Sequence, residues 1–256
     1  MTQSRLELFR KKRLTEISIR KGRPVKPSTV NRDVANLRAM LNKAVAHSKI
    51  DTNLIGRVKH LEENNVRERV LTHEEFEKLY QSCPASLKGL VLIAYYLPMR
   101  QTEILNLTWQ EIDLKMGFIR LGGDRTKNKT GRVIPLYHPR IIEFLKSCHR
   151  PIHGGYVFGE NRRFNRKAYN KAVKAAGIVD FNFHDLRHCA INNLRLAGND
   201  HYKIKQASGH KTDSALQRYN LVTEEDMKVM QWLDQQERTA GTIDTYMDTT
   251  AKKRTL

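Results

Sequence analysis

Six residues of this sequence have side chains suited to chemistry on a phosphodiester. In chain order they are Arg100, Lys127, His184, Arg187, His210 and Tyr219. Arginine, lysine and histidine can surround one phosphate with positive charge and proton donors, and a tyrosine phenol can attack the phosphorus. No single member is specific, because a His-x-x-Arg pair or a lone tyrosine occurs by chance in many chains. The ordered set predicts metal-free phosphoryl transfer through a tyrosyl intermediate.

The two arginines are the candidates for stabilising the transition state. The equatorial oxygens of a pentavalent phosphorus gain negative charge, and a guanidinium can hold two of them while staying protonated. Taken alone, Arg100 also fits a helix N-terminus paired with Glu103, and Arg187 also fits an ordinary surface position. The histidines that follow in order favour the catalytic interpretation of both.

The histidines differ in what their positions predict. His184 and Arg187 are three residues apart, so a helix presents both on one face, and His184 is the candidate general base or orienting group. His188 points about 100° away on that helix, which indicates a structural role. His210 follows Gly209, a residue that permits a tight helix end. His210 is the candidate hydrogen-bond donor to a phosphate oxygen, the alternative being a helix-terminal histidine that interacts with the macrodipole.

Tyr219, nine residues after His210, is the candidate nucleophile. A phenol with a pKa near 10 needs nearby cations or a base to become reactive at neutral pH. Tyr95 and Tyr96 lie in an apolar run and are predicted to belong to the core.

These motifs together resemble those of the tyrosine recombinase, or phage integrase, family. The resemblance extends from about Pro27 to Tyr219, and its strongest parts are the Arg-x-x-Glu, His-x-x-Arg and Gly-His strings with the tyrosine that follows. Two departures are visible. The chain has Pro98-Met99 where the family often has glycine followed by leucine or methionine, and Ser208 where a leucine commonly precedes Gly-His. Neither departure removes a chemical group.

The resemblance implies a site-specific DNA recombinase that cuts and rejoins DNA through a 3′-phosphotyrosine. Its hairpin, RTKNKTGRVIPL here, implies that Lys127 protonates the leaving 5′ oxygen, with Lys129 and Arg125 as competing candidates. The implied partners are double-stranded DNA, a homo-tetramer on two DNA sites, and accessory DNA-bending or directionality factors. Neither a cofactor nor a metal ion is implied. A type IB topoisomerase-like relaxing enzyme and a non-catalytic DNA-binding regulator of the same fold remain as alternatives.

The charge of the chain agrees with a nucleic-acid partner. Lys and Arg number 46 against 27 Asp and Glu, so the net charge is +19 and the isoelectric point is near 10.0. Such an excess favours polyanions, because neutralising phosphates releases counterions.

The three cysteines, Cys83, Cys148 and Cys189, form no zinc or disulfide pattern, and no apolar run reaches the ~20 residues of a membrane helix. We therefore expect no membrane association and a cytoplasmic, DNA-associated protein of a bacterial or phage-infected cell.

The elements that must position these residues are mainly helical. Residues 1–64 are basic and helical in pattern, and we expect them to form a core-binding domain shortened at its N-terminus. Ser28 is the predicted N-cap of a helix whose apolar stripe comprises Val30, Val34, Leu37, Leu41 and Val45. The basic residues predicted to contact DNA from this helix are Arg32, Arg38 and Lys43.

Residues 65–256 are predicted to form the catalytic domain and a C-terminal tail. Thr72 and Glu75 predict a capping box that opens a helix, and 87–97 predicts a buried helix. Segments 116–121 and 132–136 are expected to be strands around a turn at 126–131. Further helices are expected at 138–149, 162–176, 184–197, 200–208, 213–221 and 224–237. The predicted fold class is mainly α with a small antiparallel sheet (α+β).

Overall fold

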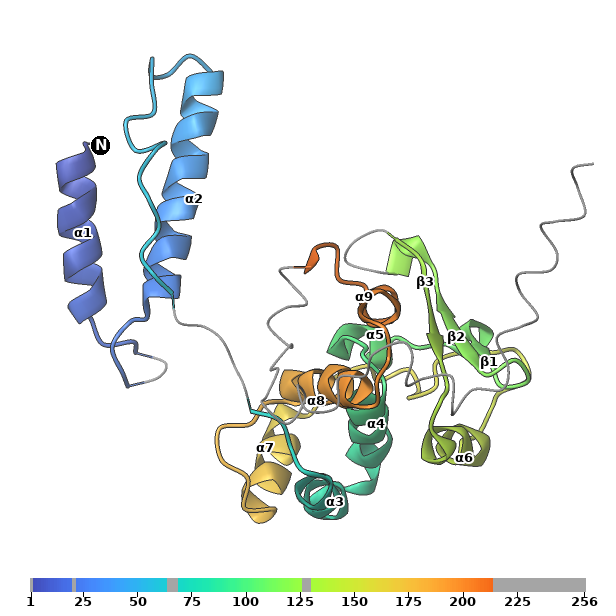
Figure 1. Cartoon of the computed structure of the whole chain (residues 1–256). Coiled ribbons are helices and arrows are strands. Elements are labelled where there is room, and N and C mark those ends of the chain that lie inside the picture. Colours follow the sequence, from blue (N-terminus) through green and yellow to red (C-terminus); the bar gives the residue numbers. More distant parts are fainter. Residues whose placement is uncertain (1, 20–21, 64–68, 126–129, 214–256) are drawn as a thin grey trace, which may run out of the picture. The chain divides into compact units, whose positions relative to one another are not determined.

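The computed structural model describes residues 2–19, 22–63, 69–125 and 130–213 (Figure 1). The chain divides into two compact units, Met1–Arg67 and Glu68–Leu256. The boundary predicted between residues 64 and 65 falls in a segment outside the described residues. Lys127, Tyr219 and the helix predicted at 224–237 also lie outside them, as does nearly all of the helix predicted at 213–221.

The first unit contains two helices among its described residues, α1 (Gln3–Thr15) and α2 (Pro27–Ala46). The prediction that Ser28 caps α2 is wrong. Lys26 is the N-cap and Pro27 is the first helical residue, a position where proline's missing N–H costs nothing and its φ is already suitable. The helical pattern expected for residues 1–64 does not extend over 47–59, where the structure has turns and irregular chain. Ser48 adopts a φ of 53°, and the Asn53 side chain accepts from the Ile55 N–H at 3.1 Å in an Asx-type turn.

The predicted apolar stripe of α2 supplies this unit's core. Val34 packs with Leu6 of α1 and Ile55, and Val30 is fully buried. Of the predicted DNA-binding residues, Arg32 and Lys43 are exposed. Arg38 is partly buried, and its guanidinium donates to the Val58 carbonyl at 2.5 Å, which ties α2 to the segment that follows it.

The second unit is built around α4 (Ala85–Tyr96), which packs against α8 (Phe183–Leu196). The capping box that opens α3 (His73–Ser82) is confirmed, since the Thr72 hydroxyl accepts from the Glu75 N–H and the Glu75 carboxylate accepts from the Thr72 N–H. Phe76 of α3 is fully buried and stacks on the Tyr95 ring at 3.6 Å between centroids. The buried helix predicted at 87–97 is therefore confirmed, together with the core position of Tyr95.

One small antiparallel sheet completes this unit. It has the order β1 (Ile112–Asp113), β2 (Phe118–Leu121) and β3 (Arg132–Pro135), with Ile119 opposite Ile134. The two longer strands confirm the prediction, whereas β1 was not predicted because two residues show no alternation. The single 3₁₀ turns Trp109–Glu111 and Gly123–Arg125 were also not predicted. The short α5 (Gln101–Leu105) begins directly after Arg100, as the alternative interpretation of that arginine expected.

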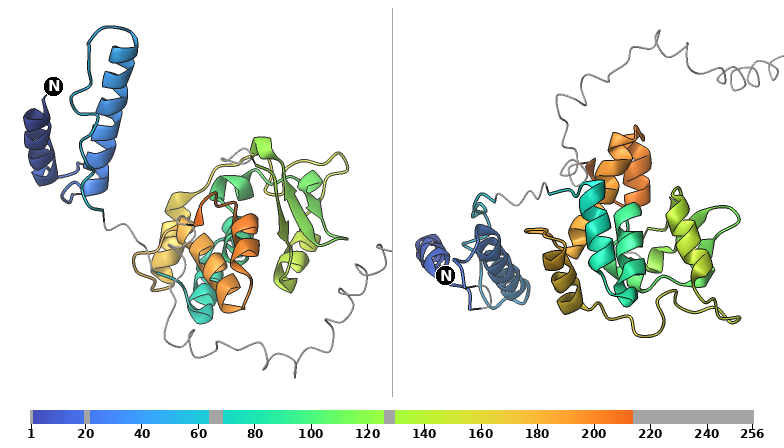
Figure 2. Two further views of the ribbon diagram at one scale, coloured as in Figure 1. Left: turned by 45° about the horizontal axis from the view of Figure 1, so that its top comes forward. Right: turned by 90° about the horizontal axis from the view of Figure 1, so that it is seen from below.

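The remaining helices are α6 (Pro139–Ser147), α7 (Arg166–Ala175) and α9 (His201–Ser208), close to the predicted ranges. Helix α7 begins later than residue 162 because the Asn165 side chain caps it by accepting from the Ala168 N–H. The sheet and α7 lie at opposite ends of the unit in each view (Figure 2). The mainly helical fold with one small sheet is thus confirmed. Within the described ranges, no helix combines the length and apolar character needed to cross a bilayer.

Candidate active site

Arg100 is the N-cap of α5 and follows the buried Met99. Its backbone N–H donates to one oxygen of Glu103 at 2.6 Å, and its guanidinium donates to the other at 2.9 Å. The same guanidinium donates at 3.3 Å to the carbonyl of Gly209, which is 109 residues away at the end of α9. Arg100 therefore pairs with Glu103 as the simpler interpretation expected, and it also reaches the segment that carries His210.

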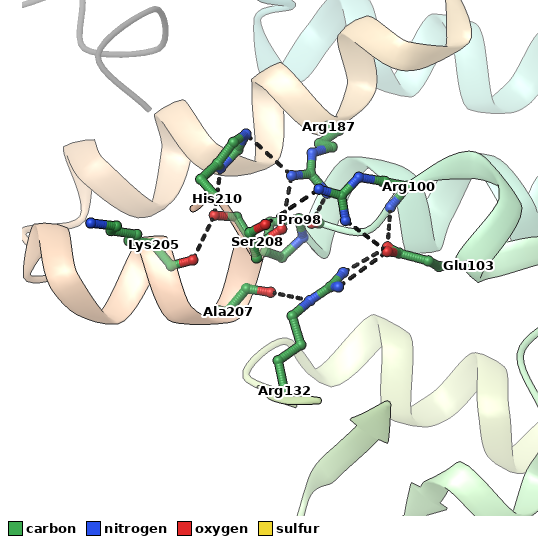
Figure 3. A network of polar contacts seen from close by, with 10 residues as sticks. Pro98, Arg100, Glu103, Arg132, Arg187, Lys205, Ala207, Ser208 and His210 are labelled. Carbon is green, nitrogen blue, oxygen red and sulfur yellow. Dashed lines mark hydrogen bonds and ion pairs between the residues drawn. The ribbon is translucent and has the colours of Figure 1, made fainter. Parts of the chain in front are cut away.

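Arg187 is almost completely buried on α8, with 2% of its surface exposed, so the surface interpretation of this residue is wrong. Its guanidinium donates to the Pro98 carbonyl at 2.7 Å and to the Ser208 carbonyl at 2.8 Å. Figure 3 shows this guanidinium beside that of Arg100. The departure from the family pattern at Pro98 thus retains the carbonyl that Arg187 binds, because a proline lacks only the backbone N–H.

A third arginine, Arg132 at the start of β3, enters the cluster from the sheet (Figure 3). Its two terminal nitrogens donate to the two oxygens of Glu103 at 3.1 and 2.6 Å, and its Nε donates to the Ala207 carbonyl at 2.9 Å. Burial alone would raise the pKa of Glu103, but the hydrogen bonds and charge of Arg132, followed by the bonds from Arg100, lower it to about 2. Glu103 is therefore a carboxylate at neutral pH, and it compensates only part of the positive charge around it.

His210 lies just beyond α9, after Gly209, whose φ of 70° is in the left-handed region. A side chain at residue 209 would also crowd the Arg132 guanidinium, because a Cβ there would lie 3.0 Å from one of its nitrogens. The expectation that Gly209 permits a tight helix end is confirmed. The turn brings the His210 Nε2 within 3.3 Å of the Arg187 guanidinium and its Nδ1 within 2.8 Å of the Ser208 hydroxyl.

Burial lowers the pKa of His210 to about 3, and the positive charges of Arg187, Arg100 and Arg132, with His188, act in the same direction. The imidazole is consequently neutral at physiological pH. It can accept one hydrogen bond and donate one, so it can donate a hydrogen bond to an anionic oxygen while carrying no charge itself.

His184 is on the first turn of α8, one helical turn before Arg187. Loss of surrounding water lowers its pKa, and the charge of Arg187 lowers it further, so the ring is neutral and able to accept a proton. Its ring forms an edge contact with His188 at 5.5 Å between centroids. His188, which the sequence argument set aside, therefore lies beside His184 and close enough to His210 to affect that pKa.

The structure thus brings four of the six predicted residues into one part of the second unit, namely Arg100, His184, Arg187 and His210. Lys127 and Tyr219 lie outside the described residues. Sequence reasoning missed Arg132 and Ser208 as members of this cluster. Arg132 was visible within the predicted hairpin segment, but only its reach across to Glu103 and Ala207 shows that it belongs here. Among the described residues, no group of three or more His, Cys, Asp or Glu side chains is placed to hold a metal ion.

Comparison with known proteins yields a consistent set of relatives. The model of the phage integrase family matches residues 69–226. A shufflon-specific DNA recombinase of Escherichia coli is 33% identical over 216 residues, which cover 82% of this chain and 55% of the relative. The integrase of Salmonella phage P22 is 26% identical, with 78% of this chain and 55% of the relative covered. The chain therefore spans about half the length of these curated relatives.

Solved structures with a similar fold include a lambda integrase dimer bound to a COC′ core site. Its TM-score is 0.66 at 20% identity, and the match covers 91% of this chain and 82% of that one. A lambda integrase tetramer bound to a Holliday junction has a TM-score of 0.63 at 20% identity, covering 84% of this chain and 65% of that one. At this identity the likeness establishes the fold.

Proposed function

We propose, on the premise that this chain belongs to the phage integrase family, that it is a site-specific DNA recombinase. The observation that carries the proposal is the convergence of Arg100, Arg187 and His210. Arg100 donates to the Gly209 carbonyl 109 positions away, next to His210, and Arg187 donates to the Pro98 carbonyl 89 positions away and lies 3.3 Å from the His210 Nε2. A cluster with excess positive charge and a neutral imidazole matches the charge distribution of a phosphoryl-transfer transition state.

In the proposed reaction, Tyr219 attacks a DNA phosphate, forms a 3′-phosphotyrosine bond and breaks the bond to the 5′ oxygen. His184 accepts the phenolic proton, and Lys127 delivers a proton to the leaving oxygen. Arg100 and Arg187 bind the non-bridging oxygens, and His210 donates to one of them. A 5′-hydroxyl then attacks the phosphotyrosine and rejoins the strand, so the bond energy is retained and no nucleotide cofactor is consumed.

The partners we propose are double-stranded DNA and further copies of this chain. The net charge of +19 supports DNA. The relative described as a tetramer on a Holliday junction supports four protomers acting on two duplexes. The N-terminal unit, with Arg32 and Lys43 exposed on α2, is proposed to contact the DNA backbone. Because Arg38 is engaged with the Val58 carbonyl, its proposed contribution to DNA binding is secondary to its role within the unit.

A suicide substrate tests the nucleophile. A nicked duplex that carries the recombination site loses a short fragment after cleavage, which traps a covalent protein–DNA complex. We expect the wild-type chain to form this complex and Tyr219→Phe to form none, with DNA binding changed by no more than a few-fold. Tyr202→Phe is the matched control, since Tyr202 is an exposed tyrosine on α9 that has no proposed role. A covalent complex formed by Tyr219→Phe would show that another residue is the nucleophile.

The products distinguish recombination from the two alternatives. Two duplexes that carry the site should yield recombinant strands and a Holliday junction intermediate. Relaxation of supercoiled DNA without any recombinant product would instead identify a topoisomerase-like enzyme. Binding without cleavage of either substrate would identify a regulator.

A further inference from the structure

Ser208 occupies an unusual place at the end of α9. It is fully buried, and its hydroxyl lies 2.8 Å from the His210 Nδ1 and 3.2 Å from the Lys205 carbonyl oxygen. A serine in the last turn of a helix often donates back to a carbonyl three residues earlier, and Ser147 does so at the end of α6 toward Phe144 at 2.7 Å. What distinguishes Ser208 is the histidine ring on the other side of the same hydroxyl.

The hydrogen bonds around His210 determine which ring nitrogen carries the proton. The guanidinium of Arg187 can only donate, so the His210 Nε2 that it faces at 3.3 Å must accept. A neutral imidazole then carries its proton on Nδ1, which donates to the Ser208 oxygen. The Ser208 hydroxyl is left to donate to the Lys205 carbonyl, in agreement with the 3.2 Å distance. The three contacts form a series of hydrogen bonds in which Arg187 donates to His210, His210 donates to Ser208, and Ser208 donates to the Lys205 carbonyl.

In this series of hydrogen bonds the His210 Nε2 accepts, whereas a histidine that binds a phosphate through Nε2 must donate from it. If Arg187 turns its N–H groups to a phosphate oxygen, Nε2 loses its donor. A phosphate oxygen accepts only, so Nε2 contributes a bond to it only when it carries the proton. Ser208 makes this possible, since a hydroxyl can donate as well as accept. By rotating away from the Lys205 carbonyl it can donate to Nδ1 instead.

We propose that Ser208 is a positioning residue that allows His210 to change its tautomer when a phosphate binds. Without a phosphate it accepts from Nδ1–H, and with a phosphate bound it donates to Nδ1 while Nε2–H donates to the phosphate oxygen. One proton leaves Nδ1 for water and one joins Nε2 from water, so the charge of the ring is unchanged. The second half of this inference rests on the proposed function, whereas the first half depends only on the contacts of the DNA-free protein.

The role requires the hydroxyl and no other part of the side chain. The Lys205 carbonyl also accepts from the Gly209 and His210 N–H groups at 2.9 and 3.2 Å, so it keeps partners when the hydroxyl is removed. The Ser208 carbonyl that holds Arg187 belongs to the backbone. Ser208→Ala is therefore expected to fold, and its loss of function would come from the imidazole. A leucine at this position, as in the family pattern, offers Nδ1 no partner.

The tautomer can be read directly from the imidazole nitrogen shifts of the full-length chain labelled with ¹⁵N-histidine. His210 is assigned by its absence from the spectrum of His210→Gln. In the wild-type protein without ligand at neutral pH, we expect the Nδ1–H form. Titration with inorganic phosphate should convert it to the Nε2–H form. Ser208→Ala should keep the Nδ1–H form without ligand, because Arg187 still donates to Nε2, but it should not convert with phosphate. Ser208→Thr, which keeps the hydroxyl, should behave like wild type.

Ser147→Ala is the matched control, because it removes a helix-terminal hydroxyl that bonds only to a carbonyl in its own helix. It should leave the His210 signals unchanged. In the suicide-substrate assay, Ser208→Ala should cleave about tenfold more slowly, the factor expected for one lost hydrogen bond, and Ser208→Thr should restore the rate.

An Nε2–H form in the ligand-free wild type, or conversion of Ser208→Ala to the Nε2–H form by phosphate, overturns the inference. An imidazolium signature with phosphate overturns it as well, because both nitrogens would then donate. The imidazole nitrogen shifts are measured without any DNA cleavage. If the tautomer follows Ser208 but Tyr219→Phe still forms the covalent complex, the proposed nucleophile fails while the assignment of Ser208 in the DNA-free protein stands.

Discussion

His210 stays neutral because its imidazole is buried and lies beside positively charged groups. The groups that lower its pKa in addition to burial are Arg187 and His188 of α8, Arg100 before α5 and Arg132 of β3. Protonating the ring would add a further positive charge beside these groups. The neutral state is thus a property of the cluster and not of the histidine alone.

The low pKa of His210 predicts an acid-sensitive fold. The unfolded chain binds a proton at this histidine below its ordinary pKa of about 6.5, whereas the folded chain does so only near 3. Between these values the unfolded state binds more protons, so stability falls as the pH is lowered through this window. Thermal unfolding at pH 7 and pH 5 should show a smaller decrease for His210→Gln than for wild type. His149→Gln, which removes an exposed histidine, should behave like wild type. Parallel decreases for His210→Gln and wild type would contradict the assignment.

Lys127 and Arg187 are predicted to act on different atoms of the same phosphate. A 5′-bridging phosphorothiolate has a leaving group that needs no proton, so Lys127→Ala should be largely rescued on that substrate. Arg187→Ala should stay impaired, since loss of an electrostatic clamp typically costs about 10²- to 10³-fold in rate. Cleavage rates on both substrates measure the difference. Rescue of Lys129→Ala, with Lys127→Ala behaving like wild type, would transfer the acid role to Lys129.

At the scale of elements, Arg132 connects three parts of the second unit. It extends from β3, binds Glu103 of α5 and holds the end of α9 through the Ala207 carbonyl. The same arginine therefore relates the sheet to the turn that carries His210. The end of α9 and strand β3 are thus held together by the Arg132 side chain and not by backbone pairing.

Arg132→Met should be strongly destabilising, because it leaves the buried Glu103 carboxylate with Arg100 as its remaining cation among the contacts described here. Removing one partner of a buried pair costs about 3–5 kcal/mol. Arg120→Met is the matched control on the neighbouring strand, where Arg120 pairs with Asp113 at 2.9 Å in a largely exposed position. That pair should contribute less than about 1 kcal/mol. Urea unfolding measures both, and equal losses would show that Arg132 stabilises the unit no more than a surface ion pair does.

At the scale of the whole molecule, the net charge of +19 predicts that salt controls DNA binding. Binding by counterion release weakens steeply with ionic strength. Since positive side chains are proposed to supply the charge stabilisation that a metal ion would otherwise provide, formation of the covalent complex should persist in EDTA. Loss of the complex on chelation, with recovery on adding Mg²⁺, would contradict a metal-free reaction. Binding that is insensitive to added salt would contradict the electrostatic account.

The sequence by itself determined those features that depend on a few neighbouring residues. The capping box at Thr72, the apolar spacing of α2 and the glycine that ends α9 are local interactions, and each of them was predicted. The motif order also selected Arg100, His184, Arg187 and His210 as candidates, and the structure brings these four side chains together.

Only the tertiary structure decided how these residues meet. Arg132 reaches Glu103 across 29 positions, and Arg187 reaches the Pro98 carbonyl across 89. Such contacts depend on how α4, α8 and the sheet pack, which no local pattern encodes. The same holds for Arg38, whose sequence environment indicated a DNA contact although its guanidinium binds the Val58 carbonyl. For Ser208 the residue type was visible at once, but its meaning came from the orientation of an imidazole that Arg187, from another helix, constrains.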